Sequence, residues 1–358
     1  MIKIKNDTPI IARLISAIDS YIECQQIENG NKNNITNPFI YDEINGYPVF
    51  CPGQVSDINN CNDQIVIIDH LMESYNIHWF FDEYPTDKFY LFLANGFWNT
   101  NDLKIKYKVV TFNYILYTTV ESHHSLSYSA NFYQDKNYNF NYKKEYLFTS
   151  LIGKIKPWRD KFVDVILNGV NCNNYILNYN GKEFKQPAHH YDIKYDFDNF
   201  NSYENISPTK CINIGQMIPI EMFNRSKILL VVETSCFDFV EFHLTEKTVK
   251  ALITGMPFVV VSSYKFLENL KALGFKTYSD IWSEDYDQIQ DQQQRFESIV
   301  ETLNYIDTLE WNDELIDKLK MISYHNKEVL MNLNVIAKKQ IKNIVEIIND
   351  IDNTDYTQ

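Results

Sequence analysis

The segment from Glu233 to Val261 reads ETSCFDFVEFHLTEKTVKALITGMPFVVV, and it decides the expected fold class. The apolar run Ile228–Val232 directly before it is typical of a buried strand. Residues 245–254 have helical spacing and are followed by Gly255, the residue that most often ends a helix. A second apolar strand follows at Pro257–Val261. The order strand, loop, helix, strand predicts a βαβ unit with parallel strands.

The same alternation of short apolar runs and helix-length pieces extends in both directions along the chain. It predicts an α/β protein with two α/β units rather than a β-sandwich. Pro157 suits the first turn of a helix over Trp158–Leu167, and a second short helix is expected at Phe266–Leu273, before Gly274. The remaining expected strands are Gln64–Asp69, His78–Phe81, Phe89–Ala94, Lys108–Phe112 and Tyr146–Leu151.

Domain boundaries follow from the polar, Asn- and Tyr-rich stretch Ser122–Lys144, which is typical of a linker. We expect an N-terminal domain at 1–140, a C-terminal domain at 145–310, and a helical tail at 311–358 that packs back on both domains. The length of 358 residues agrees with two domains.

Composition excludes several classes of protein. With 45% hydrophobic residues the chain is not disordered. The net charge of -14 disfavours a broad nucleic-acid surface, which needs clustered Lys and Arg. The chain has no run of 18 apolar residues, and its first residues lack the long apolar stretch typical of a signal peptide. We therefore expect no signal peptide, no membrane span and a cytoplasmic location, in the host cytoplasm if the protein is viral. The six cysteines lack CxxC spacing, so a zinc cluster is not expected.

The first turn of the helix at 245–254 combines residues suited to a nucleotide. Thr245 is a good N-cap, and the helix N-terminus lies at the carboxyl edge of the sheet, where ligands bind in open α/β folds. Lys247 would contact a phosphate, and Glu246 would accept hydrogen bonds from ribose hydroxyls. The alternative is an ordinary capped helix with a solvated lysine.

This segment resembles the nucleotide-binding signature of α-1,3-fucosyltransferases, FENS…DYxTEKLxxALxAGxVPVV. The matching pieces are 232–235, Thr245-Glu246-Lys247, Ala251-Leu252, Gly255 and 257–260. Downstream, residues 267–295 resemble a C-terminal segment of viral and bacterial glycosyltransferase-like proteins. The chain departs from the signature at Thr234, where the family has Asn, and at Phe242-His243, where it has Asp-Tyr, so the resemblance does not specify fucose or the base.

The segment GKIKPWRDKF, residues 153–162, resembles the phosphate-side segment of the same family. Arg159 lies in the first turn of the expected helix, where a guanidinium can bind a diphosphate through two hydrogen bonds. Lys154 and Lys156 add positive charge to an acidic chain. A basic surface loop is the alternative interpretation.

The resemblance implies a GT-B-like fold, with two Rossmann-like domains facing across a cleft, and a donor site in the C-terminal domain. The implied reaction transfers a sugar from a nucleoside-diphosphate sugar to an acceptor hydroxyl, on a glycan or similar molecule, with inversion and without a required divalent metal or other cofactor. The implied donor-binding residues are Arg159, Lys154, Glu233, Thr245, Glu246 and Lys247.

An inverting transferase also needs a general base, which in the resembled fold comes from the N-terminal domain. Glu83 and Asp69 are the leading candidates for this catalytic role because each lies at or just beyond an apolar strand; Asp82 and Glu121 are further candidates.

Other interpretations stay open at this point. Two D-x-D triplets, Asp196-Phe-Asp198 and Asp285-Tyr-Asp287, have the form that binds Mg²⁺ or Mn²⁺ with a sugar diphosphate, but such triplets arise easily in an acidic chain. The adjacent histidines at 189–190 and 123–124 point opposite ways on an extended segment, which disfavours a metal pair. Alternative functions are a viral-type DNA-base glycosyltransferase and a non-catalytic nucleotide- or glycan-binding protein of the same fold.

Overall fold

The computed structural model divides the chain into two compact units, of which the first comprises 1–118, 239–244 and 331–358 and the second comprises 119–238 and 245–330. The expected domains were 1–140 and 145–310 with a tail from 311. The structure describes residues 4–6, 41–44, 47–50, 55–70, 83–94, 96–98, 105–111, 113, 116, 137–153, 155–179, 218–236, 240–332, 340, 343, 346, 347 and 350.

The first unit contains a mixed six-stranded sheet in the order β1-β2-β3-β4-β5-β7. Its strands are β1 (Ile4–Asn6), β2 (Tyr41–Ile44), β3 (Tyr47–Phe50), β4 (Ile65–His70), β5 (Phe89–Ala94) and β7 (Lys106–Thr111), and α2 (Val55–Asn60) precedes β4. The pairs β3-β4, β4-β5 and β5-β7 are parallel, whereas β1-β2 and β2-β3 are antiparallel. The expected strands at 64–69, 89–94 and 108–112 are thus confirmed, apart from shifts of up to two residues at their ends.

The antiparallel part of this sheet was not expected from the sequence. Strands β1, β2 and β3 are three or four residues long and lack the sustained apolar run that identifies a buried strand. The first unit also contains β6 (Gly96–Trp98), paired antiparallel with β11 (Val240–His243). The expected strand His78–Phe81 lies outside the described residues.

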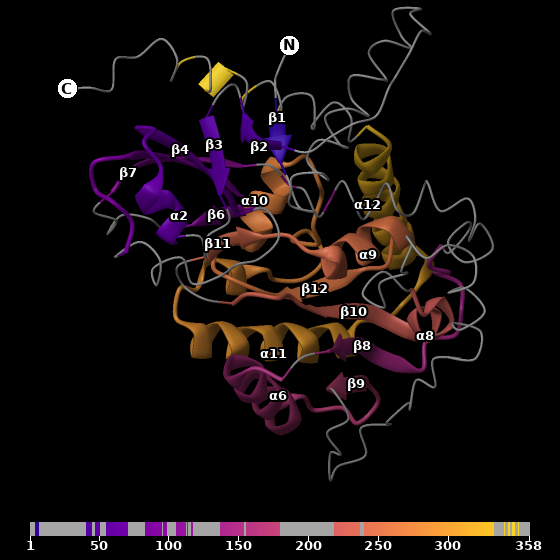
Figure 1. Ribbon diagram of the computed structural model, residues 1–358. Coiled ribbons are helices and arrows are strands. Elements are labelled where there is room, and N and C mark those ends of the chain that lie inside the picture. Colours follow the sequence, from indigo (N-terminus) through magenta and orange to yellow (C-terminus); the bar gives the residue numbers. More distant parts are fainter. Residues whose placement is uncertain are drawn as a thin grey trace, which may run out of the picture. The chain divides into compact units, whose positions relative to one another are not determined.

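The second unit contains a fully parallel sheet in the order β12-β10-β8-β9, shown in Figure 1. The strands are β8 (Tyr146–Ile152), β9 (Ile176–Tyr179), β10 (Ser226–Val232) and β12 (Phe258–Val261). Nearly every residue of β10 and β12 is buried, as expected for strands covered on both faces. The predicted βαβ unit is therefore confirmed, and the chain is an α/β protein with parallel-strand sheets.

Helices of the second unit connect and cover this sheet. They are α6 (Pro157–Gly169), α8 (Ile220–Arg225), α9 (Glu246–Thr254), α10 (Phe266–Ala272), α11 (Gln292–Thr308) and α12 (Asp313–Met331), with a 3₁₀ turn, η3, at Asp285–Gln288. Phe296 of α11 packs edge-on against Phe162 of α6, with ring centroids 5.0 Å apart, and lies beside Trp158. Pro157 begins α6, as predicted.

The ends of α9 also follow the sequence prediction. The hydroxyl of Thr245 accepts from the backbone N–H of Lys247, and Gly255 ends the helix with a φ of 71° in the left-handed region. The expected helical tail is observed in part, as α12. In the described part of the chain, no helix has both the length and the apolar character needed to cross a membrane.

Candidate active site at the carboxyl edge of the second sheet

The candidate site is built around the two residues that follow β10, Glu233 and Thr234. Three cationic side chains from two other segments bind this short loop. Lys156, at the start of α6, donates to the carbonyl oxygen of Thr234 at 2.8 Å. Arg159, one turn later, donates from Nη2 to the carbonyl oxygen of Glu233 at 2.7 Å. Lys247 of α9 donates to the Thr234 hydroxyl at 3.1 Å. The two basic segments singled out in the sequence therefore lie together at one sheet edge.

The Glu233 side chain is fully buried, and its carboxylate binds the beginning of α9. Oε1 accepts from the backbone N–H groups of Thr245 and Thr248, both at 3.3 Å, and from the Thr248 hydroxyl at 2.5 Å. Oε2 accepts from the Thr245 hydroxyl and from the N–H of Thr234. The carboxylate thus occupies the position at the helix N-terminus that favours an anion. A bound phosphate would be held by side chains beside this helix end rather than by these backbone donors.

Arg159 is also buried, with 3% of its surface exposed. Its guanidinium lies 5.1 Å from the centre of the Trp158 ring. Burial lowers the pKa of Arg159, although the charge of Glu233 opposes this shift. Because its Nη2 ties α6 to the β10 loop, Arg159 holds the positions of the more exposed lysines around it.

Lys247 and Glu246 form an ion pair at 2.8 Å, and their side chains are 23% and 26% exposed. Burial acts to raise the pKa of the Glu246 carboxyl, but Lys247 and Lys250 outweigh it and the pKa is lowered. Burial lowers the pKa of Lys250 to about 8, against the attraction of Glu246. The exposed part of the site therefore carries an ionised carboxylate between two amines.

Several residues of this site were not anticipated. Thr248 and Tyr179 are the clearest cases, since the Tyr179 hydroxyl accepts from the N–H of Lys156 at 3.2 Å and donates to Asp160 at 3.1 Å. Lys250 follows Glu246 by four residues, a spacing that places two side chains together on a helix, and this signal was available in the sequence. No comparable sequence signal connects Tyr179 with α6.

The other expected site residues are distributed over both units. Lys154 lies outside the described residues, as do Asp82, Glu121, both histidine pairs and the D-x-D triplet at 196–198. Asp69 lies in β4, one residue before its end. Glu83 is exposed, in a turn between β4 and β5. Both leading candidates for the general base therefore belong to the first unit, whereas the basic cluster belongs to the second.

The second D-x-D triplet has a structural role in η3. The Asp287 carboxylate accepts from the backbone N–H of Leu267 at 2.7 Å and of Glu268 at 3.0 Å, at the start of α10. Burial raises the pKa of Asp287 to about 6, against these two hydrogen bonds. Within the described ranges no group of three His, Cys, Asp or Glu side chains is arranged to hold a metal ion.

No protein-family model matches the chain, and no curated protein matches it at a significant level.

Proposed function

We propose that this protein is a nucleotide-sugar-dependent glycosyltransferase with a GT-B-like arrangement of its two α/β units. It would move a sugar from a nucleoside-diphosphate sugar to the hydroxyl of a glycan or similar acceptor, with inversion and without a required metal. One observation carries the proposal: Lys156 and Arg159, at the start of α6, and Lys247 of α9 bind the same loop, residues 233–234, at the carboxyl edge of a parallel sheet.

In this proposal the cluster binds the diphosphate of the donor. When the glycosidic bond breaks, negative charge grows on the leaving diphosphate, and cations held in place beforehand stabilise it. Lys247 and Lys156 are the partly exposed cations, so they would contact the phosphates. Arg159 would act as a positioning residue, because it is buried and bound to the loop backbone.

Glu246 would bind the sugar part of the nucleotide. Its carboxylate is ionised and a quarter exposed, and it lies beside the proposed phosphate ligand Lys247. A carboxylate in this state accepts hydrogen bonds from the paired hydroxyls of a ribose. The general base would be Asp69 or Glu83, which would remove the proton of the acceptor hydroxyl as its oxygen attacks the anomeric carbon.

A thermal-shift experiment on the full chain tests the donor site. The ligands are GDP, UDP, CMP and dTDP, each with Mg²⁺ and with EDTA. A ligand at 100 times its Kd stabilises the folded state by about 2.7 kcal/mol, which gives a readable rise in Tm. We expect one diphosphate to raise Tm equally with EDTA and with Mg²⁺. Lys247→Met should abolish this rise, whereas Lys161→Met, at an exposed position of α6, should leave it unchanged.

Each other outcome has a defined meaning. The absence of a shift with every nucleotide would overturn the donor site, and a shift that requires Mg²⁺ would overturn the metal-independent reaction. Nucleotide binding without release of nucleotide from any donor sugar would indicate the non-catalytic binding protein. Tight, salt-dependent binding of duplex DNA would favour the DNA-base glycosyltransferase.

A further inference from the structure

A second candidate site lies at the opposite edge of the same sheet. A cavity of about 550 Å³ is lined by residues 140–144, which lead into β8, and by Lys227 at the start of β10. Leu309 and Trp311 from the connection between α11 and α12, and Asp313 and Ile316 from the first turn of α12, complete the lining. Strands β8 and β10 are each seven residues long, so at about 3.3 Å per residue roughly 20 Å separates the two edges. This cavity is therefore distinct from the basic cluster around Glu233.

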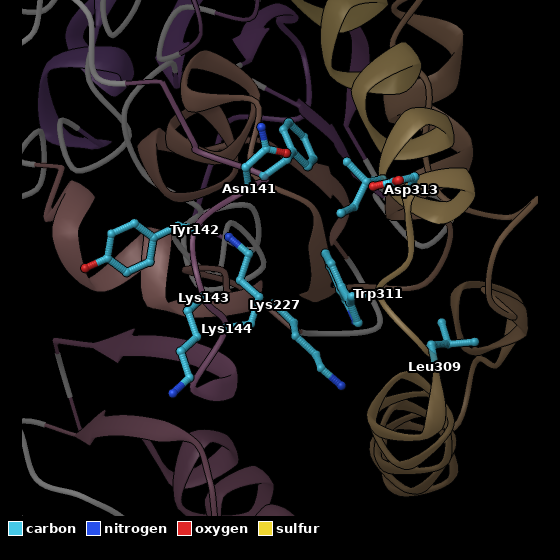
Figure 2. Close-up of a pocket in the computed structure, with 10 residues that line it drawn as sticks. Asn141, Tyr142, Lys143, Lys144, Lys227, Leu309, Trp311 and Asp313 are labelled. Atoms are coloured by element: carbon cyan, nitrogen blue, oxygen red, sulfur yellow. The ribbon is translucent and has the colours of Figure 1, made fainter.

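Aromatic side chains form much of the cavity wall. Phe140 and Tyr142 come from the segment before β8, and Trp311 comes from the connection between α11 and α12. In Figure 2 Trp311 lies beside Lys227, the ammonium groups of the three lysines point in different directions, and the ring of Tyr142 points away from Trp311. Ring surfaces of this kind pack against the flat face of a bound ring.

The cavity carries a surplus of positive charge. Three lysines line it, Lys143, Lys144 and Lys227, but only one carboxylate, Asp313. The ammonium of Lys144 donates to the carbonyl oxygens of Asn139 at 2.7 Å and Asn224 at 2.9 Å, and it lies 3.9 Å from the centre of the Tyr138 ring. Among the described residues no carboxylate is within ion-pair distance of it. In a chain with a net charge of -14 this local excess of cations is unusual.

Two hydrogen-bond donors at the cavity, on Lys227 and Trp311, have no carboxylate acceptor at hydrogen-bond distance among the described residues. Lys227 donates mainly to a neutral acceptor, the carbonyl oxygen of Asp307 at 3.1 Å, and the Asp307 carboxylate is more distant at 3.8 Å. The indole Nε1 of Trp311 is buried and has no hydrogen-bond partner in the part of the chain that the structure describes. This nitrogen is enclosed by protein atoms rather than exposed in the cavity, so it offers no donor to a bound ligand.

We infer that this cavity binds a small organic anion in which a flat ring lies next to the charged group. The lysines would bind the anionic group, and Phe140, Tyr142 and Trp311 would pack against the ring. Because the cavity lies at the other edge of the sheet, this inference does not depend on the proposed glycosyl transfer.

Lys144 makes the binding sensitive to pH. Burial lowers the pKa of Lys144 to about 7, so without a ligand its ammonium loses its proton near neutral pH. The group is surrounded by the carbonyl oxygens of Asn139 and Asn224 and by the Tyr138 ring, none of which titrates near neutral pH. The other charged groups at the cavity are Lys143, Asp313, and Lys227 with its ion-pair partner Asp307. A bound anion favours the protonated amine, and we therefore expect affinity to fall as pH rises through 7.

Calorimetric titration of the full chain with three probes tests this inference. The probes are phenyl sulfate, inorganic sulfate and phenol, none of which changes charge between pH 6 and 8. We expect phenyl sulfate to bind at least tenfold more tightly than either of the others. Its affinity at pH 8 should be about threefold or more below its affinity at pH 6. Lys143→Glu and Trp311→Leu should each weaken it at least fivefold. Two control variants should bind phenyl sulfate as the unchanged protein does: Lys161→Glu, an exposed charge reversal on α6, and Lys247→Met.

Other results would overturn the inference. Equal affinity for sulfate and phenyl sulfate would indicate a nonspecific anion site, and binding that is lost with Lys247→Met would place the probe at the other sheet edge. The absence of saturable binding of phenyl sulfate below about 10 mM would also refute it. Far-ultraviolet circular dichroism of Lys143→Glu and Trp311→Leu distinguishes loss of binding from loss of folding. If both variants are unfolded, Lys143→Gln, at an exposed position, is the substitute.

Discussion

At the scale of single residues, Glu233 joins three parts of the second unit. Its backbone carbonyl binds Arg159 of α6, and its carboxylate accepts from Thr234, Thr245 and Thr248. A buried carboxylate with five donors is stable only because every donor is present. This side chain therefore fixes the beginning of α9, on which the position of Lys247 depends.

Glu233→Gln should be strongly destabilising. The glutamine has one acceptor oxygen in place of two, and its NH₂ group would face N–H donors, so we expect the free energy of unfolding to fall by about 2–4 kcal/mol. Urea denaturation measures this loss. Glu301→Gln, at an exposed position of α11, should change it by less than about 0.5 kcal/mol. A loss below about 1 kcal/mol for Glu233→Gln would contradict the capping role.

At the scale of the helix, Gly255 decides how α9 ends against α12. Its φ of 71° lies in the left-handed region, and a Cβ built there would clash with the Ser323 hydroxyl oxygen. Gly274, after α10, has a φ of 98°, but a Cβ there would meet only Val329 at 4.0 Å. Alanine substitutions at the two glycines therefore distinguish the cost of backbone strain, present at both, from the cost of a steric clash, present only at Gly255.

Gly274→Ala should cost about 1–2 kcal/mol of stability, the penalty of a left-handed alanine. Gly255→Ala should cost roughly 3 kcal/mol or more, because the clash with Ser323 adds to that strain. Adding Ser323→Ala to Gly255→Ala should restore part of the difference. Urea midpoints of the unchanged protein, the two single glycine variants and the double variant measure these effects. Equal losses of stability for Gly255→Ala and Gly274→Ala would contradict the close packing of α9 against α12.

At the scale of the whole molecule, the proposed reaction needs both compact units. The cation cluster belongs to the second unit, whereas Asp69 and Glu83 belong to the first. A side chain that only removes a proton from the acceptor contributes to turnover and not to donor binding.

Asp69→Asn or Glu83→Gln should therefore lower kcat for sugar transfer by about 10²–10⁴-fold while the Kd for the nucleotide stays within twofold of that of the unchanged protein. Steady-state transfer assays and calorimetric nucleotide titration measure the two quantities separately. Glu301→Gln serves as a neutral control in both assays. Full activity in both variants would exclude these residues as the base, and a parallel loss of nucleotide binding would indicate a structural role.

Much of the second unit was predictable because its signals are local. The strand at 228–232 is an uninterrupted apolar run, the strand at 146–151 is apolar apart from Thr149 and Ser150, and the ends of α9 are marked by Thr245 and Gly255. The strands β1, β2 and β3 were missed because they are only three or four residues long, too short to show a sustained apolar pattern.

The sequence by itself determined the α/β class, the bounds of the βαβ unit, and the two basic segments at 153–162 and 245–247. These properties depend on hydrophobic periodicity and helix capping, which act over a few residues. Only the tertiary structure decided that Lys156, Arg159 and Lys247 bind one loop, that the Glu233 carboxylate faces α9, and that lysines and aromatic rings line a cavity at the other sheet edge. Those arrangements join residues from 12 to about 170 positions apart, and strand order and packing determine such contacts rather than local pattern.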